Sequence, residues 1–298
     1  MNQAKEKKIF LIINKFAGHK VGERAVDVVV PFLIKNKCIV EYSFTNHPGH
    51  ATELAQKASA NEFDLIVAVG GDGTVNEVAQ GLVGTKSIMG IIPMGSGNGL
   101  ARELGISMNI RKSARALLEG NTLELDVCRL NNQRFLCTSG IGFDARIAYL
   151  MGKASTRGFM KYVQLVLQES IAYKPVDVRM KIDGVVVDRS VFLITFANAS
   201  QFGNNAFIAP GASMTDGLID VVIVKKFNKL WMPVFAVSLF SKLIPKLPFV
   251  ETFKAKQIEL ELADTPVFHF DGDPGNLNIP AKISVDPERI LVRSGIKY

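Results

Sequence analysis

Two glycine-rich stretches contain the residue types that hold a phosphate group. The first, GGDGTVNE at residues 70–77, directly follows the apolar run FDLIVAV, and the second, GSGN at 95–98, lies just after the apolar run IMGIIP. Glycine lets a backbone approach a bulky anion closely, and the start of a helix offers unpaired N–H groups to phosphate. The first stretch therefore predicts a phosphate-binding loop. The second is an ordinary Gly/Ser loop when taken alone, but beside the first it is expected to contact the same ligand.

A carboxylate, Asp72, lies in the middle of the first stretch. A tight turn does not require it, and it repels phosphate unless a cation lies between them. Asp72 therefore implies either a bridging Mg²⁺ ion or a role in proton transfer. The sequence contains neither the GxxxxGK[ST] motif of a P-loop nor the GxGxxG fingerprint of dinucleotide binding.

Short apolar runs alternate with helical patterns in the first part of the chain, which predicts a parallel sheet with helices on both faces. Ligands of such sheets bind at the carboxyl ends of the strands, where both glycine stretches fall. Pro31, inside the first helical pattern, predicts a kink or an early stop. The expected strands cover residues 9–13, 38–45, 64–69 and 88–93, and the expected helices cover 23–35, 51–60 and 74–82.

After about residue 123 the apolar residues alternate with a period of two, which predicts antiparallel strands. Asp183 and Gly184 mark a tight hairpin turn. Helical patterns at residues 156–173 and 228–242 interrupt the strands. These features predict a second domain, a β-sandwich, with a cleft between it and the first.

The composition and charge limit the classes of molecule that the protein is expected to bind. The 298 residues include 48% hydrophobic residues and carry a net charge of +7, so a polyphosphate or an anionic membrane surface fits, whereas no nucleic-acid-binding motif appears. Three cysteines without CxxC spacing favour buried thiols, and the four histidines form no ligand-spaced cluster with them. The amino terminus lacks the pattern of a signal peptide, and we expect a cytoplasmic protein. A homodimer is compatible with these features.

The run LWMPVFAVSLF at residues 230–240 is shorter than the roughly 18–20 residues that a spanning helix needs. Apolar residues framed by lysines suit a membrane interface. We expect peripheral attachment of the 230–250 region to the inner membrane face; the alternative is a core helix with solvated lysines at its ends. The flanking lysines are Lys225, Lys226, Lys229, Lys242 and Lys246.

The order and spacing of the motifs resemble the catalytic family of diacylglycerol kinases and sphingosine kinases, the soluble lipid kinases. The motifs are NKFAG, GGDGTVNEV, PMGSGNGLAREL, LDV, GIGFDA, TDGLIDV and DGDP. The resemblance implies an α/β nucleotide-binding domain at residues 1–124 and a β-sandwich lipid-substrate domain at 125–287, with a final strand at about 288–298 returning to the first domain.

The resemblance also implies residue roles. The residues matched to ATP binding are Asn14, Lys15, Phe16, Ala17, Gly18, Thr45, Gly70, Gly71, Asp72, Gly73, Thr74, Val75, Asn76, Ser96 and Asn98. Those matched to catalysis are Asp72, Asp126, Asp271 and Asp273. A second cation site, found in related bacterial lipid kinases, corresponds here to Ser213, Asp216 and Leu218; the alternative is a plain Asp-Gly turn between strands.

Three carboxylates compete for the role of proton acceptor: Asp72, Asp271 and Asp273. Asp273 stands where the family has a glutamate, one methylene longer, so Asp271 and Asp273 are considered together. We expect this pair to supply the base and Asp72 to position Mg²⁺ and phosphate, because a carboxylate near Mg²⁺ is weakly basic. The alternative is Asp72 as the base. Asp126 could instead be a structural residue that caps a strand or pairs with Arg129.

The function that these features predict is transfer of the γ-phosphoryl group of ATP, with Mg²⁺, to a hydroxyl group of a diacylglycerol or sphingoid-type lipid. Two other classes stay open: a kinase with a soluble substrate, such as an NAD kinase, and a catalytically silent lipid-binding module.

Overall fold

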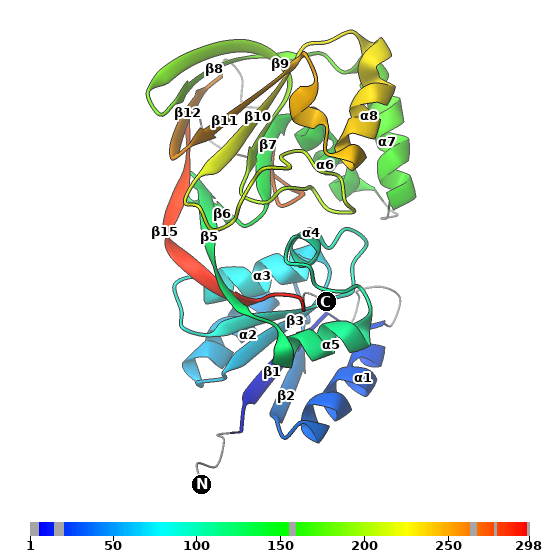
Figure 1. Ribbon diagram of the computed structural model, residues 1–298, viewed down its shortest axis with the longest axis vertical. Helices are drawn as coiled ribbons and strands as arrows, with labels where there is room; N and C mark the ends of the chain where they lie inside the picture. Colours follow the sequence, from blue (N-terminus) through cyan, green and yellow to red (C-terminus); the bar gives the residue numbers. More distant parts are fainter. Residues whose placement is uncertain (1–5, 15–20, 155–158, 263–266, 277–278, 297–298) are drawn as a thin grey trace. The chain divides into compact units, whose positions relative to one another are not determined.

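The computed structural model describes residues 6–14, 21–154, 159–262, 267–276 and 279–296 (Figure 1). Contacts divide the chain into two compact units. Unit 1 comprises Met1–Leu125 and Glu288–Tyr298, and unit 2 comprises Asp126–Pro287. The chain therefore leaves unit 1 once and returns to it at its end.

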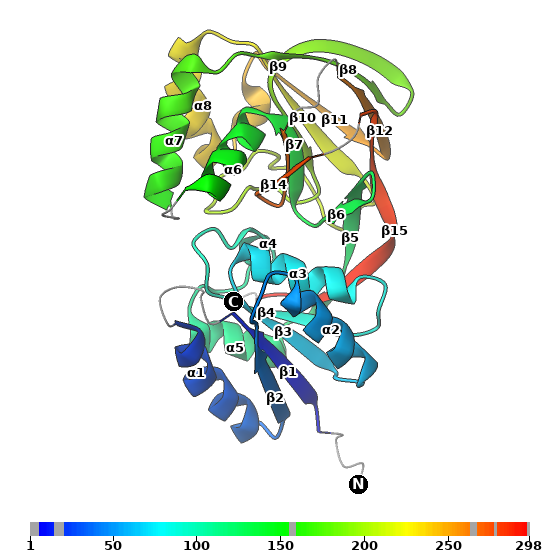
Figure 2. The same cartoon turned by 180° about the vertical axis from the view of Figure 1, so that it is seen from behind.

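Unit 1 is a parallel sheet with the strand order β15-β4-β3-β1-β2. All six residues of β3 are buried, as expected for a central strand that helices cover on both faces. Helices α1 and α5 cover one face, and α2 and α3 pack together on the other (Figures 1 and 2). The strands are β1 (Lys8–Ile13), β2 (Ile39–Phe44), β3 (Leu65–Gly70), β4 (Ile88–Pro93) and the end of β15 (Ala281–Arg293); the helices are α1 (Val21–Lys35), α2 (His50–Ala60), α3 (Asp72–Leu82), α4 (Gly99–Glu103) and α5 (Ile110–Glu119).

Three local features of unit 1 differ from the expectations. Helix α1 continues past Pro31 to Lys35, so an early stop is wrong. Helix α5 has strong amphipathic character, with Ser113, Ala114, Ala116 and Leu117 buried, yet it was not predicted. The short α4 was also missed; at five residues it is too short to give a periodic signal.

Unit 2 is an antiparallel β structure, as predicted. The hairpin at Asp183 and Gly184 is confirmed: both residues have positive φ, and Ile182 pairs with Val185 across the turn. The strands are β5 (Thr122–Leu130), β6 (Gln133–Phe135), β7 (Thr138–Gly142), β8 (Val176–Ile182), β9 (Val185–Ala197), β10 (Ile219–Lys225), β11 (Val250–Ala255), β12 (Gln257–Glu261), β13 (Val267–Phe270), β14 (Asp273–Asn276) and β15.

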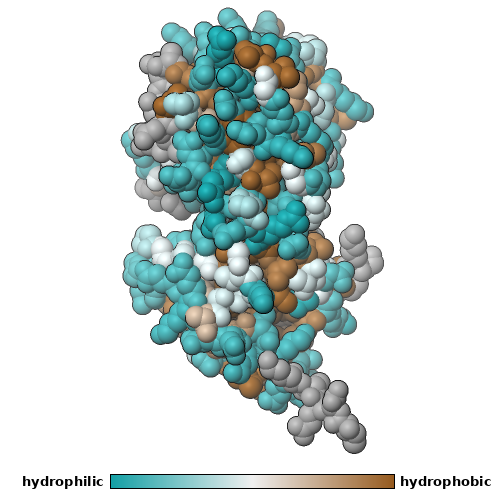
Figure 3. Space-filling view, turned by 90° about the vertical axis from the view of Figure 1, so that its left-hand side faces the viewer, coloured by the Kyte–Doolittle hydropathy of each residue, from teal (hydrophilic) through white to brown (hydrophobic). Residues whose placement is uncertain are grey.

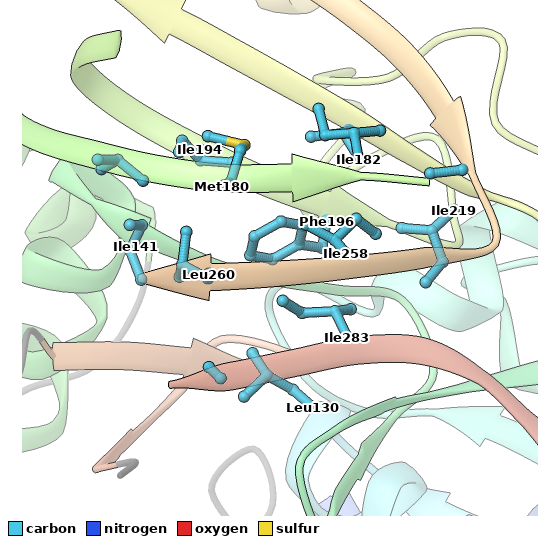
Figure 4. Close-up of a cluster of buried hydrophobic side chains, with 14 of the residues drawn as sticks. Leu130, Ile141, Met180, Ile182, Ile194, Phe196, Ile219, Ile258, Leu260 and Ile283 are labelled. Atoms are coloured by element: carbon cyan, nitrogen blue, oxygen red, sulfur yellow. The ribbon is translucent and has the colours of Figure 1, made fainter. Parts of the chain in front are cut away.

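One apolar core lies between the strands of unit 2. Figure 4 shows side chains from several strands pointing into one shared space, among them Met180, Phe196, Leu260 and Ile283. On β8, the buried Val178, Met180 and Ile182 alternate with charged residues that are exposed. Teal dominates the part of unit 2 that is visible in Figure 3, which views the side where β8, β12 and β15 lie in Figure 1.

The helical segments of unit 2 pack on a second apolar cluster. This cluster includes Ile147 of α6, Leu165 of α7 and Phe235 of α8. Helix α6 was not expected, whereas α7 and α8 fall within the predicted ranges. The segments are α6 (Phe143–Lys153), α7 (Phe159–Ala172), η1 (Lys229–Trp231), α8 (Met232–Ser241) and η2 (Ile244–Lys246).

Two further expectations were tested by the structure. The three cysteines form no disulfide; Cys128 and Cys137 are buried, while Cys38 is half-buried. In the part of the chain that the structure describes, no helix is long and apolar enough to cross a membrane.

Candidate active site

The ends of four strands of unit 1 bring the predicted phosphate-binding residues to one edge of the sheet. Asn14 N donates to Val69 O at 3.0 Å, and Thr45 N donates to Ile13 O at 2.9 Å. Met94 N donates to Gly70 O at 2.8 Å, which places the second glycine stretch beside the first. Residues Lys15, Phe16, Ala17 and Gly18, also expected here, lie outside the described residues.

Asp72 joins the two glycine stretches through both of its carboxylate oxygens. Oδ2 accepts a hydrogen bond from Asn98 N at 2.8 Å, and Oδ1 accepts one from Gly99 N at 2.6 Å. These are charge-assisted bonds to the start of α4, a position that favours a negative charge. Asp72 therefore has a structural task that the sequence did not reveal, in addition to any task toward a ligand.

The glycines allow the two stretches to pack backbone against backbone. A Cβ atom on Gly95 would lie 2.6 Å from Gly71 Cα, and a Cβ on Gly97 would lie 2.7 Å from Asp72 Oδ2. Neither distance is tolerable without movement. The glycine density had been explained by the approach of an anion; at Gly95 and Gly97 the contact between the stretches is itself sufficient reason.

Several side chains brace the second stretch. Asn98 is buried with φ 51°, and its amide bonds both Gly95 N and Gly95 O. Arg102 Nε donates to Gly97 O at 2.9 Å. Ser96, by contrast, is exposed. The tip of the stretch is thus presented to solvent on a rigid base.

The start of α3 retains the features of an anion-binding helix end. Its N-cap residue is Gly71, and no side chain caps it, so the first N–H groups are not satisfied by a capping oxygen. Asn14 Nδ2 donates to Thr74 Oγ1 at 3.0 Å, tying the end of β1 to the first turn of α3. Asn76 Oδ1 accepts from Gln80 Nε2 at 3.0 Å. This edge can hold a phosphate against backbone donors.

His47, His50 and Glu53 form a group at the neighbouring start of α2 that the sequence analysis did not identify, with ligand atoms within 4.8 Å of one another. The hydrogen bonds argue against a metal site. His50 Nδ1 accepts from Asn46 N at 3.1 Å, so the neutral ring carries its proton on Nε2 and has no free lone pair for a metal. The rings of His47 and His50 stack at 4.7 Å between centroids, which suits a structural pair.

Asp126 of unit 2 is fully buried and holds the turn at residues 214–217. Its Oδ2 accepts from Gly217 N at 2.7 Å, and its backbone N donates to Met214 O at 2.7 Å. The predicted alternative, a pair with Arg129, is wrong: Arg129 Nη2 lies 2.6 Å from Asp286 Oδ2. Asp286, a buried carboxylate, also pairs with Arg134. The partner of Arg129 is therefore Asp286.

Asp271, one member of the predicted catalytic pair, holds three backbone groups of unit 2. Its carboxylate accepts backbone hydrogen bonds from Leu136, Cys137 and Thr138, at 2.7–3.0 Å, and so uses three of roughly four lone-pair sites. Burial raises the pKa of Asp271, and the three donors oppose that rise. Asp271 and Gly272 form the tight turn between β13 and β14, with φ 51° and 90°.

Asp273, the other member of the predicted pair, is exposed at the first residue of β14. Because β13 and β14 are joined by the turn that Asp271 anchors, Asp273 is held on a fixed hairpin. Asp273 is the more exposed member of the pair.

The predicted second cation site does not suit a divalent ion. Asp216 Oδ2 accepts from Lys254 Nζ at 2.8 Å, and Asp216 Oδ1 accepts from Leu218 N at 3.1 Å. The only charged ligand of the predicted site is therefore paired with the ammonium group of Lys254, which repels a second cation. Ser213 Oγ lies 3.2 Å from Thr215 Oγ1. Lys254 could not be recognised from sequence, because only the register of β10 and β11 brings it near Asp216.

A buried hydrogen-bonded group, which sequence reasoning missed, connects the GIGFDA motif to the strand that leads into the DGDP motif. His269 Nε2 lies 3.1 Å from Asp144 Oδ2, and Thr195 Oγ1 donates to the same oxygen at 3.2 Å. The side chains of His269 and Asp144 are 3% and 9% exposed. This contact ties the start of α6 to β13, the strand that leads into Asp271.

Comparison with known proteins identifies the class. The model of the diacylglycerol kinase catalytic domain matches residues 8–130, and the model of the YegS C-terminal NAD kinase beta sandwich-like domain matches residues 138–293. A diacylglycerol kinase of Bacillus subtilis (strain 168) is 28% identical over 277 residues, 91% of each chain. One of Mycobacterium tuberculosis (strain CDC 1551 / Oshkosh) is 28% identical over 96% of this chain and 94% of its own.

A solved structure of a diacylglycerol kinase from Bacillus anthracis str. Sterne has the same fold, with a TM-score of 0.79 at 24% identity over 98% of each chain. An α/β unit and a β-sandwich unit that match these two models define a lipid kinase, and the enzyme class follows. The chain belongs to the family of the diacylglycerol kinase catalytic domain with a YegS-type C-terminal domain. Membership implies ATP as the phosphoryl donor.

Proposed function

We propose that this chain transfers the γ-phosphoryl group of ATP, in the presence of Mg²⁺, to the free hydroxyl of a diacylglycerol. The observation that carries the proposal is the pair of glycine stretches joined by Asp72 at the carboxyl edge of the unit 1 sheet. The names of the relatives that match over nine-tenths of the chain support diacylglycerol as the first lipid to test. A sphingoid-type lipid is the second candidate, because the motifs also resemble those of sphingosine kinases.

In this proposal the start of α3 and the two stretches hold the phosphates of ATP. Backbone N–H groups there supply donors without moving, and positioning with charge neutralisation is the main requirement of phosphoryl transfer. Asp72 would help to hold Mg²⁺, since each of its oxygens accepts only one hydrogen bond, and the ion would supply positive charge beside the phosphates. The binding residues are Asn14, Thr45, Gly70, Gly71, Asp72, Gly73, Thr74, Val75, Asn76, Ser96 and Asn98, joined by Lys15, Phe16, Ala17 and Gly18.

We assign the proton acceptor for the lipid hydroxyl to Asp273. An acceptor must be able to reach the substrate, and Asp273 is exposed whereas Asp271 is bonded to three backbone groups. Asp271 and Asp126 become positioning residues. The first anchors the hairpin that carries Asp273, and the second fixes the 214–217 turn.

The lipid would be met at a membrane surface through η1, α8 and η2. The apolar side chains that point away from the core there include Leu230, 83% exposed, and Val237, 67% exposed, while Phe235 faces the core. The alternative of a plain core helix does not account for these exposures. Exposed lysines surround the apolar residues, which fits an anionic lipid surface. They are Lys226, Lys229, Lys242 and Lys246.

The experiment is a labelling assay with γ-labelled ATP and purified protein. Separate reactions receive diacylglycerol, monoacylglycerol, sphingosine, ceramide, phosphatidylglycerol or NAD, and products are identified by mass. We expect label in diacylglycerol, dependent on Mg²⁺, and none with the Asp72→Asn variant, which excludes a contaminating kinase. If only NAD were labelled, the protein would be a kinase with a soluble substrate. If it bound ATP without any labelled product, it would be a catalytically silent module.

A further inference from the structure

One ammonium group and two carboxylates meet beside the turn that Asp126 holds. Lys254 Nζ lies 2.8 Å from Asp216 Oδ2 and 3.2 Å from Asp220 Oδ2. Asp220 and Lys254 are directly opposite each other in the antiparallel pair of β10 and β11, neighbouring strands in Figure 1. The strand register therefore fixes the position of the lysine backbone, and Asp216 at the turn completes the contact.

We propose that Lys254 is a built-in cation that takes the place of a divalent ion at Ser213, Asp216 and Leu218, and that it acts as a positioning residue for Asp126. Unit 2 then needs no divalent ion at this position. Only the role toward Asp126 in catalysis rests on the proposed function, because the test below measures stability.

The need for a cation comes from the carboxylates. Asp220 has a side chain only 14% exposed, so its carboxylate is largely removed from water. Two carboxylates that share one partner repel each other unless a positive charge lies between them. Lys254 Nζ lies within hydrogen-bond distance of both Asp216 and Asp220, so this one ammonium group supplies that charge.

A divalent ion could not simply be added to this arrangement. Mg²⁺ binds carboxylate oxygens at about 2.1 Å and Ca²⁺ at about 2.3–2.6 Å, and either would have to approach the Asp216 carboxylate, which is already paired with Lys254 Nζ. The ammonium would lie within a few ångströms of the ion and repel it. The lysine and the divalent ion are thus alternatives for one position.

A short series of hydrogen bonds connects Lys254 to Asp126. Asp216, which Lys254 binds, is followed directly by Gly217, whose N donates to Asp126 Oδ2. Asn198 Nδ2 donates to Asp126 O at 2.8 Å and to Leu136 O at 2.7 Å, and Leu136 N donates to Asp271. Loss of the ammonium would therefore loosen the turn on one side of Asp126, while the Asn198 side stays bonded.

The test compares wild type with Lys254→Met, which removes the charge and keeps an unbranched apolar side chain. Thermal unfolding is measured without nucleotide, with and without millimolar Mg²⁺ or Ca²⁺. We expect the wild-type midpoint to be insensitive to both ions. The Lys254→Met midpoint should be on the order of 2–4 °C lower and should rise when either ion is added, because Asp216 and Asp220 then need a new cation.

Three further proteins make the result specific. Lys282→Met removes a lysine of the same unit, 64% exposed and 3.9 Å from Glu259, and should behave as wild type. Lys254→Arg keeps the charge and should show no ion response. Asp216→Asn in the wild-type background should leave the midpoint insensitive to the ions, and it remains informative if Lys254→Met does not fold.

Two results would overturn the proposal. One is saturable stabilisation of the wild type by Mg²⁺ or Ca²⁺ without nucleotide that Asp216→Asn removes, since the site would then bind an ion beside the lysine. The other is a folded Lys254→Met protein with a wild-type midpoint and no ion response. Neither result depends on kinase activity, so failure here is distinguishable from failure of the labelling assay.

Discussion

The carboxylate of Asp72 accepts a hydrogen bond from the backbone N–H of Gly99 at 2.6 Å, joining the start of α3 to the start of α4. Its second oxygen binds the neighbouring Asn98 N. Asp72→Asn replaces one of these acceptor oxygens with an NH₂ group, which cannot accept from a backbone N–H. We expect unit 1 to lose about 1–3 kcal/mol of stability in denaturant unfolding, and ATP affinity to fall in a titration.

Asp64→Asn is the matched control for this variant. Asp64 Oδ2 also accepts a backbone N–H, from Lys8 at 2.9 Å, but it lies just before β3, at the opposite strand end from the glycine stretches. It should leave ATP affinity unchanged. If the Asp72→Asn protein were as stable as wild type but inactive, the structural role would be excluded and Asp72 would act only on the reactants.

The contact between Gly71 and Gly95 makes a second prediction. Gly95→Ala would place a methyl group 2.6 Å from Gly71 Cα and 2.9 Å from Asn98 Oδ1, so the stretches must separate. Overpacking of this kind costs about 1–3 kcal/mol, and we expect ATP binding to weaken with it in calorimetry. Gly211→Ala, where no atom lies within 4 Å of the added Cβ, should change neither quantity. Equal behaviour of the two variants would refute the packing argument.

The fold of unit 1 was predictable because its elements have strong local signals. The strands β1 to β4 are short runs rich in apolar residues, and β3 is buried along its whole length. In unit 2 the two-residue alternation of β8 and the turn at Asp183 and Gly184 were equally clear. Helix α6 escaped because it begins at Phe143, directly after the strand residue Gly142, without a polar capping residue to mark its start.

The site was predictable by residue type and less so by role. Motif spacing identified Asp72, Asp126 and Asp271 as important, but their partners are backbone groups far away in sequence, such as Gly217 for Asp126. Such partners carry no side-chain signature. Lys254 was missed for the same reason, since only the pairing of β10 with β11 places it opposite Asp220.

The exposed apolar residues of η1 and α8 predict binding to anionic membranes. Leu230→Ser with Val237→Ser removes the two most exposed of these side chains and should reduce vesicle binding by about tenfold or more. Binding should also weaken as salt screens the lysines, each worth about 1 kcal/mol near such a surface. Co-sedimentation with vesicles that contain phosphatidylglycerol measures both effects.

Val185→Ser is the control for that experiment. Val185 is 66% exposed in the same unit, at the β8–β9 hairpin, and its loss should not affect vesicle binding. Binding that ignored both anionic lipid and ionic strength would contradict the assignment of this surface.

The ion pair of Lys254 predicts a pH dependence of stability. The pKa of Lys254 in the folded chain is raised above 10.5, chiefly by the hydrogen bond to Asp216. The stabilisation is therefore fully present below pH 10.5 and is lost as the pH rises through the folded value. The stability difference between wild type and Lys254→Met, from denaturant unfolding, should shrink above pH 10.5 and stay constant between pH 7 and 9. A difference that shrinks toward neutral pH would count against this ion pair.

The last prediction separates Asp273 from Asp271. Asp273 is exposed on the hairpin, so Asp273→Asn should fold normally and bind ATP with nearly unchanged affinity. If Asp273 accepts the hydroxyl proton, its loss should lower kcat by about 10²–10⁴, the usual contribution of a general base.

Asp271→Asn should act differently: it removes an acceptor from the backbone donors of Leu136, Cys137 and Thr138, so the midpoint of unfolding should fall together with activity. Steady-state kinetics with diacylglycerol and thermal unfolding of both variants give the comparison. Near-normal kcat in Asp273→Asn, with an inactive but stable Asp72→Asn protein, would move the base to Asp72.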